Sequence, residues 1–153
     1  MIAFLLSMAL VSTKLPGSGS RMNVSPPVSA SMASDILRYV NQHRHSMGLK
    51  PLEANSYISS VALGHSKDML SGKTPFGHEG FRDRIDLIRK RLGPLHVVAE
   101  NVASGPMTAR EVVDGWLHSP GHRRNIEGDF HLTGIGVATA RNGMIYFTQI
   151  FAK

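Results

Sequence analysis

Two histidines and a glutamate are the residues of this chain best suited to chemistry, although they lie far apart in sequence. His78 lies in a Phe-Gly-His run, Glu100 in an Ala-Glu-Asn-Val run and His122 in a Ser-Pro-Gly-His-Arg run. Two neutral imidazoles and a carboxylate are good ligands for a borderline divalent ion such as Zn²⁺. An ion held in this way could acidify a bound water, with Glu100 as ligand or base. Their spacing does not group them, because a helix-borne zinc motif places its histidines at i and i+4.

The sequence excludes several other kinds of site. The chain has no cysteine, so it has no disulfide, no thiolate metal site and no cysteine nucleophile. It also lacks a Gly-x-Ser-x-Gly run, a phosphate-binding glycine loop and a His-Glu-x-x-His motif. Ser66 follows His65 directly, but adjacent residues of a helix point in different directions and cannot pair as nucleophile and base.

Each residue of interest also has a purely structural interpretation. Glu100 can accept hydrogen bonds from loop N–H groups, and His78 can be an ordinary loop residue. His122 can interact with the negative end of the preceding helix. His65 lies on the apolar stripe of a predicted helix, which favours a core or supporting histidine over a ligand. Trp116 lies on another such stripe and is assigned to the core.

Apolar residues recur at helical spacing in four segments. The first three predicted helices cover residues 34–47, 55–70 and 81–92. A fourth follows Thr108, because Thr-Ala-Arg-Glu forms a capping box whose hydroxyl and carboxylate satisfy unpaired N–H groups. The Ser-Pro-Gly run that begins at Ser119 is expected to end this helix sharply.

The end of the chain has the pattern of a β-hairpin. Residues 135–139 alternate, and residues 144–151 are almost wholly apolar, as in a central strand that is covered on both faces. Between them, Asn142-Gly143 can supply the pair of positive φ angles that a two-residue hairpin turn needs. Residues 96–102 alternate weakly and predict one more short strand. Helices combined with an antiparallel hairpin indicate an α+β domain.

Residues 1–33 are predicted to precede the domain, which then covers residues 34–153. The first eleven residues are apolar but too few to span a bilayer, and their length suits the hydrophobic part of a signal peptide. The basic residues that normally precede such a segment are missing. Either the start codon lies inside a longer leader, or the segment is no signal; export is the favoured interpretation. Residues 12–33 are rich in Ser, Pro and Gly and read as a linker.

At 153 residues the chain has the length of one domain, and it carries a net charge of +6. A field of this sign favours anionic partners such as lipid headgroups and envelope polymers, although a solvated basic face is the ordinary alternative. Nucleic acid is disfavoured as a partner, because no aromatic-interleaved motif accompanies the charge. The cluster proposed to meet anionic surfaces consists of Arg82, Arg84, Arg89, Lys90 and Arg91.

The runs around Glu100 and His122, followed by Gly-Ile-Gly-Val from Gly134 and Tyr-Phe-Thr-Gln-Ile-Phe from Tyr146, resemble the CAP superfamily. This is the family of cysteine-rich secretory proteins, antigen 5 and pathogenesis-related 1, also called the SCP-like domain. The similarity covers residues 34–153 and is closest to the disulfide-free bacterial branch. It implies a three-layer α-β-α sandwich with a small, mainly antiparallel sheet.

The resemblance also implies a shared cleft formed by His78, Glu100, His122 and Ser119. In animal and plant members a second glutamate lies three residues after the tryptophan. Here that position is Ser119, as in many bacterial relatives, which weakens any mechanism that needs two carboxylates. The implied metal ligands are His78 and His122, with Zn²⁺ as the cofactor that would suit them, and Glu100 is the candidate catalytic residue.

Three functions follow as hypotheses from this resemblance. The favoured one is an exported protein, periplasmic or extracellular, whose cleft binds a lipid-like or envelope-derived ligand, with or without a divalent ion, and does not turn it over. The alternative is a metal-dependent hydrolase of peptide or envelope polymer that uses His78, His122 and Glu100. The third is a basic module that adheres to anionic envelope material and makes no use of the cleft.

Overall fold

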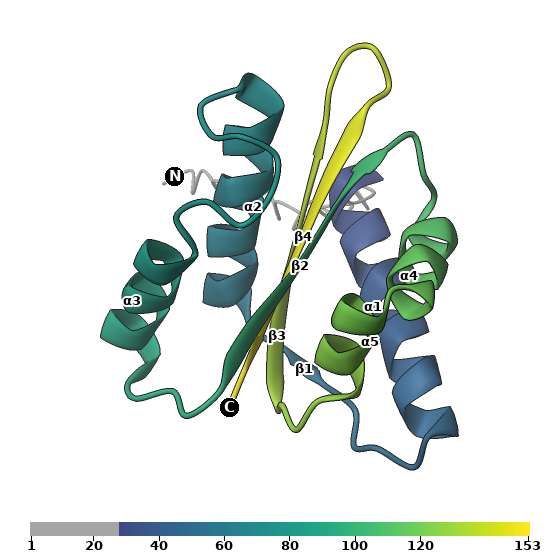
Figure 1. Ribbon diagram of the computed structural model, residues 1–153, viewed down its shortest axis with the longest axis vertical. Coiled ribbons are helices and arrows are strands. Elements are labelled where there is room, and N and C mark those ends of the chain that lie inside the picture. The colour runs from purple at the N-terminus through teal and green to yellow at the C-terminus, as the bar shows by residue number, and fades with distance from the viewer. Residues whose placement is uncertain (1–27) are drawn as a thin grey trace, which may run out of the picture.

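The computed structural model describes residues 28–153, which form three layers with a sheet between two groups of helices (Figure 1). In chain order the elements are α1 (Val28–Ser46), β1 (Glu53–Ala54), α2 (Ser56–Ser71), α3 (Phe81–Leu92), β2 (Val98–Gly105), α4 (Ala109–His118), α5 (Pro120–Glu127), β3 (Leu132–Thr139) and β4 (Ile145–Ala152). Helices α2 and α3 cover one face of the sheet, and α1, α4 and α5 cover the other. The predicted α-β-α sandwich is therefore confirmed.

The sheet has the strand order β1-β3-β4-β2. Strand β4 is central and pairs antiparallel with both β2 and β3, as its almost continuous apolar sequence predicts. The short β1 pairs parallel with β3, so the sheet is mixed rather than purely antiparallel. The edge strand β2 is the one that carries Glu100.

The hairpin between β3 and β4 is present, but its turn is not the two-residue turn that Asn142-Gly143 suggested. Within residues 28–153 only glycines have positive φ, so Asn142 does not, while Gly143 has φ 84°. The N–H of Gly143 donates to the carbonyl of Ala140 at 3.0 Å, and the N–H of Ala140 donates to the carbonyl of Met144 at 2.8 Å. The result is a three-residue loop with glycine at the left-handed position.

Two glycines of β3 let α2 pack directly on the sheet. A Cβ at Gly134 would lie 2.2 Å from the backbone nitrogen of Ser59, and one at Gly136 would lie 2.2 Å from that of Leu63. No side chain fits at this distance, so the Gly-Ile-Gly run is a packing requirement. The close approach holds α2, and with it His65, against the sheet.

Two element boundaries differ from the prediction. Helix α1 begins at Val28 rather than at Ser34, because Met32 and Ala33 pack against the core and extend its buried face. The predictions for residues 1–27, including the signal-like segment, fall outside the described residues. Strand β2 runs from Val98 to Gly105, so it both begins and ends later in the chain than the predicted range 96–102.

Helix α5 was not expected. The Ser-Pro-Gly run does end α4, yet Pro120 is also the first residue of α5, where its missing N–H costs nothing and its fixed φ suits a helix. One short sequence therefore stops one helix and starts the next. This matters for the site, because α5 carries His122 and Asn125.

Each face of the sheet has its own apolar core. The larger core lies under α1 and α4 and is centred on Trp116, whose Nε1–H donates to the carbonyl of Val102 at 3.2 Å. The smaller core lies under α2 and α3 and includes Ile58, Ile85 and Ile88. No helix among residues 28–153 has both the length and the apolar character needed to cross a membrane.

Candidate functional site

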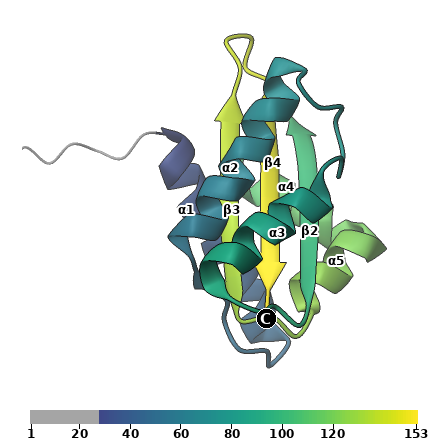
Figure 2. The same cartoon turned by 90° about the vertical axis from the view of Figure 1, so that its left-hand side faces the viewer.

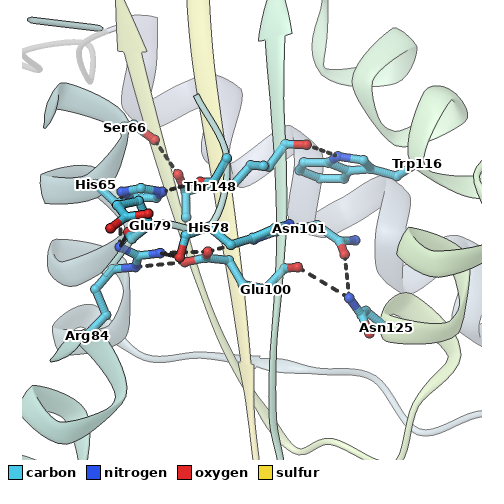
Figure 3. A network of polar contacts seen from close by, with 12 residues as sticks. His65, Ser66, His78, Glu79, Arg84, Glu100, Asn101, Trp116, Asn125 and Thr148 are labelled. Atoms are coloured by element: carbon cyan, nitrogen blue, oxygen red, sulfur yellow. Dashed lines mark hydrogen bonds and ion pairs between the residues drawn. The ribbon is translucent and has the colours of Figure 1, made fainter. Parts of the chain in front are cut away.

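Glu100 is the third residue of β2, with its carboxylate directed toward α3 and only 1% of its side chain exposed. Arg84 of α3 binds it with two parallel hydrogen bonds: Nε donates to Oε2 at 2.8 Å and Nη2 donates to Oε1 at 2.7 Å. This planar, bidentate geometry is the strong form of an ion pair. Figure 3 shows the pair at the centre of a polar network that runs from α2 to α5.

His78 completes the environment of that carboxylate. Its Nδ1–H donates to Oε1 of Glu100 at 2.9 Å, so both carboxylate oxygens already accept hydrogen bonds. The His78 side chain is 53% exposed, and its remaining ring nitrogen, Nε2, is the one left to meet a ligand. A histidine whose Nδ1–H is held by a carboxylate has a fixed tautomer and a fixed ring orientation.

Arg84 also anchors the loop that carries His78. Its Nη1 donates to the carbonyl of Glu79 at 2.6 Å and lies 3.1 Å from Nδ1 of His65. Gly80, with φ 73°, leaves room for this guanidinium, because a Cβ there would lie 3.3 Å from Nη1. Arg84 is buried, so its assignment to a surface patch for anionic partners was wrong.

His65 supports the same loop from α2. Its Nε2–H donates to the carbonyl of Gly77 at 2.8 Å, and Nδ1 is left to accept from Arg84. Burial lowers the pKa of His65; the bond to Gly77 opposes this shift and the charge of Arg84 adds to it. His65 is therefore a neutral supporting residue, one of the two roles that its sequence position suggested.

On the other side of β2, two asparagines attach α5 to the strand. Asn101 donates to the backbone carbonyl of His122 at 3.2 Å. Asn125 donates to the side-chain oxygen of Asn101 at 2.8 Å and to the backbone carbonyl of Glu100 at 3.3 Å. These contacts place His122, in the first turn of α5, beside the strand that carries Glu100.

His122 is half-buried and lies near His78. Burial lowers the pKa of His122, and the charge of His78 lowers it further. Both effects favour the neutral form of His122. Ser119 lies at the junction of α4 and α5, where its N–H donates to the carbonyl of Trp116 at 3.1 Å and its own carbonyl accepts from Arg123 at 2.8 Å.

The cavity at this site is small and open, with a volume of about 270 Å³. Its lining consists of His78, Phe81, Ala99, Glu100 and Asn125. Of the four residues predicted for the cleft, the structure places His78 and Glu100 in direct contact and His122 nearby. Ser119 and His122 are not among the residues that line this cavity.

The residues present do not fit a resident zinc ion. Catalytic zinc sites use three protein ligands, and two imidazoles leave such a site one ligand short. Glu100 could supply the third only through the one lone pair of Oε2 that Arg84 leaves free, and its side chain is 1% exposed. Across residues 28–153 no group of three or more histidine, aspartate or glutamate side chains is placed to hold a metal ion.

The sequence contained a signal for Arg84 that was overlooked. Phe81, Ile85 and Ile88 define the buried stripe of α3, and Arg84 lies on the same stripe, one turn after Phe81. A charged residue on an apolar stripe needs a buried partner. Asn125 had no comparable signal, because α5 itself was not predicted.

Comparisons with known proteins agree with this fold. The model of the cysteine-rich secretory protein family, CAP, matches residues 37–151. YkwD of Bacillus subtilis is 30% identical over an alignment of 146 residues, and the match covers 92% of this chain and 56% of YkwD. An outer surface protein from Borrelia burgdorferi has a TM-score of 0.69 at 22% identity, over 80% of this chain and 92% of that protein.

An extracellular protein containing an SCP domain, from Bacillus anthracis, also has a TM-score of 0.69, at 26% identity. The match covers 82% of this chain but 41% of that protein. This chain thus spans little more than half of YkwD and less than half of the Bacillus anthracis protein. Without cysteines, it resembles the disulfide-free bacterial members. The chain belongs to the cysteine-rich secretory protein (CAP) family.

Proposed function

We propose that this CAP domain is exported, to the periplasm or the extracellular space, and binds a ligand at the His78 cleft without turning it over. The observation that supports binding over catalysis is the state of Glu100. A general base needs a free lone pair within reach of the proton that it removes. Three hydrogen bonds already occupy the Glu100 carboxylate, and with its side chain 1% exposed the one remaining lone pair, on Oε2, is out of reach of a substrate. The similarity to an outer surface protein and to an extracellular protein supports export.

The cavity lining suggests the chemistry of the ligand. Phe81 and Ala99 offer apolar surface, while Nε2 of His78 can accept a hydrogen bond from a hydroxyl or amide. A few polar groups that converge on apolar walls are typical of small-molecule sites. A lipid-like or envelope-derived molecule with one such donor fits this lining.

A hydrolase of peptide or envelope polymer is the second candidate, and the His78–Glu100 hydrogen bond is the observation that favours it. An imidazole oriented by a carboxylate, with its other nitrogen free, is the arrangement of a general base. In that case His78, not Glu100, would take the proton, and Glu100 would be a positioning residue. The donor set argues against the metal-dependent version of this hydrolase.

Replacing His78 separates the two candidates. Purified protein and His78→Ala are each incubated with a lipid extract and with a peptide digest of bacterial envelope, and bound molecules and reaction products are identified by mass spectrometry. His118→Ala, which removes another exposed histidine that does not line the cavity, is the control. We expect bound ligand with the parent and the control, little with His78→Ala, and no products. A parent activity that falls by about 10²–10⁴ in His78→Ala, the usual loss of a general base, would establish the enzyme instead.

A further inference from the structure

We propose that the cleft continues across the edge of β2 into a second subsite, between α3 and β2, which binds the anionic end of one elongated ligand. The anionic group is a carboxylate or a phosphate, and Arg82 and Arg89 are the residues that recognise it. This inference rests on the proposed ligand binding at His78 and adds the polarity and direction of the ligand.

A hollow of about 370 Å³ lies beside the site, and Phe81, Ile85 and Val98 form its apolar part. Phe81 also lines the cavity at His78, and Val98 precedes Ala99, which lines that cavity as well. Phe81 therefore borders both hollows. Val98 and Ala99 are neighbours on β2 but face opposite sides of the sheet, so the hollows adjoin across the edge of this strand. Figure 2 shows α3 crossing obliquely in front of the sheet, with one end over β2.

The charged part of the hollow favours an anion. Arg82 and Arg89 both line it and are both exposed, with Asp86 between them. Seven residues along a helix are two turns, so the two guanidinium groups lie on the same side of α3, about 10 Å apart. Among residues 28–153 Arg82 makes no ion pair, and the contact of Arg89 with Asp86 is long, at 3.5 Å. Guanidinium forks suit carboxylate and phosphate groups.

The other end of the groove has a different character. Around His78 the lining is apolar except for the imidazole and the Asn125 amide, because the charge of Glu100 is neutralised by Arg84. A ligand that fills both hollows thus places its uncharged end at His78 and its charge at Arg82 and Arg89. This polarity fixes the direction in which the ligand lies.

Addition of a peptide strand to the free edge of β2 is disfavoured. The backbone carbonyls of Glu100 and Val102 already accept hydrogen bonds, from Asn125 at 3.3 Å and from Trp116 at 3.2 Å. A β-strand ligand would need these acceptors for its own N–H groups. Recognition by apolar contact and by one charged end does not need them.

The test uses octyl phosphate and octanoate as probes, with octanol as the neutral analogue and inorganic phosphate as the headgroup alone. Binding is followed by NMR, through the side-chain N–H signals of Arg82 and Arg89 and the imidazole signals of His78. The key variant is Arg82→Gln/Arg89→Gln. Its matched control is Lys90→Gln/Arg91→Gln, which removes the same charge from exposed positions of the same helix that do not line the hollow.

We expect each anionic probe to shift both the signals of Arg82 and Arg89 and those of His78. The probe that binds more tightly, octyl phosphate or octanoate, identifies the headgroup. Affinity should fall about tenfold or more in Arg82→Gln/Arg89→Gln, which is the loss of one charge-assisted hydrogen bond or more. The control should lose less than about threefold, since only screened, longer-range attraction is removed.

The failures of the two proposals are distinguishable. One outcome is that octanol binds as tightly as octyl phosphate and the His78 signals shift in both double variants. This would overturn the anionic subsite and leave the cleft at His78 intact. Shifts at Arg82 and Arg89 without shifts at His78, or equal losses in the two double variants, would overturn the continuous groove. Shifts at neither end with any probe would overturn the subsite and count against binding at His78.

Discussion

The two faces of the sheet are built for different purposes. The face under α1 and α4 buries more than twice as many apolar residues as the face under α2 and α3, and Trp116 lies at its centre. The face under α2 and α3 buries a carboxylate, a guanidinium and an imidazole that contact one another, from Glu100, Arg84 and His65. The other face also buries a guanidinium, that of Arg44, but it binds backbone carbonyls only. Most of the apolar burial that stabilises the fold is therefore on the α1/α4 face of the sheet. The polar groups that orient His78 are on the α2/α3 face.

The difference shows what the buried ion pair contributes. A buried salt bridge adds little net stability, because desolvation of two charges offsets most of their attraction. Apolar residues at the positions of Arg84 and Glu100 would restore most of this stability, although the Glu79 carbonyl and His65 would lose the donor that Arg84 supplies. The value of Arg84 and Glu100 lies in position: together they fix the loop that carries His78 and the orientation of its ring. The residues that hold the fold are therefore largely distinct from those that hold the site.

The largest expected effect is on the apolar face. Trp116→Ala should lower the free energy of unfolding by about 4 kcal/mol, since it removes the largest buried side chain and leaves a cavity. The His78 signals in the NMR spectrum of the folded variant should stay where they are, because the change lies on the other face. Urea unfolding measures the first quantity. A loss under about 1 kcal/mol would contradict the assignment of the main core to this face.

The second largest effect is expected on the α2/α3 face, from loss of the Arg84–Glu100 ion pair. Arg84→Met should lower the free energy of unfolding by about 3 kcal/mol, because it leaves the Glu100 charge buried and uncompensated. The double variant Arg84→Met/Glu100→Leu should recover part of this loss and yet leave the His78 ring without its fixed orientation. Arg82→Met, on the exposed side of the same helix, should change stability by less than about 0.5 kcal/mol.

A double variant less stable than Arg84→Met would show that the pair itself stabilises the fold, which would remove the contrast between the two faces.

The bond between Arg84 and Glu100 also affects how a simpler variant, Glu100→Gln, can be interpreted. Glu100→Gln is a reasonable test of a catalytic base, but it also leaves the buried guanidinium of Arg84 without its counter-charge. Loss of function in that variant alone would therefore say little about catalysis.

A smaller effect should appear as pH dependence on the polar face. Burial lowers the pKa of His65 below 6.5, the value that applies to the unfolded chain. As pH falls below 6.5, His65 binds a proton in the unfolded chain but stays neutral in the folded one. Its contribution to the free energy of unfolding is therefore fully present above this pH and declines below it. His122, whose pKa is also lowered, acts in the same direction.

Urea unfolding at several pH values between about 7 and 5 measures this decline. The variant His65→Gln should show a flatter dependence than the parent, whatever its stability at neutral pH. Among the carboxylates, the lowered pKa values of Glu111, Glu127 and Asp129 place their titration below about pH 4.5, outside this window. A slope unchanged in His65→Gln would show that His65 is not a buried neutral imidazole.

Much of the fold could be predicted from local patterns. Helical spacing identified α2 and α3, the capping box at Thr108 located the start of α4, and the apolar run identified β4 as the central strand. Helix α5 could not be found in this way, because a proline after a serine is both a stop and a start signal. The turn at Asn142-Gly143 fits two loop lengths, and the sequence alone does not choose between them.

The site could be predicted only in part. The resemblance identified His78 and Glu100, which are in contact in the structure. It could not show that Arg84 binds the Glu100 carboxylate, because the arginine lies sixteen residues away in sequence and the other basic residues of its helix are exposed. The proposal that Glu100 positions His78 rather than acting as a base rests on this tertiary contact.

The central claim is that Glu100, held by Arg84, fixes His78 with Nδ1 protonated and Nε2 free for the ligand. Long-range proton–nitrogen NMR of the imidazoles tests it directly at a pH where His78 is neutral. The account predicts a protonated Nδ1 and a bare Nε2 in the parent and in Arg82→Met, and a mixture of the two tautomers in Arg84→Met/Glu100→Leu. A parent His78 with its proton on Nε2, or with mixed tautomers, would contradict it.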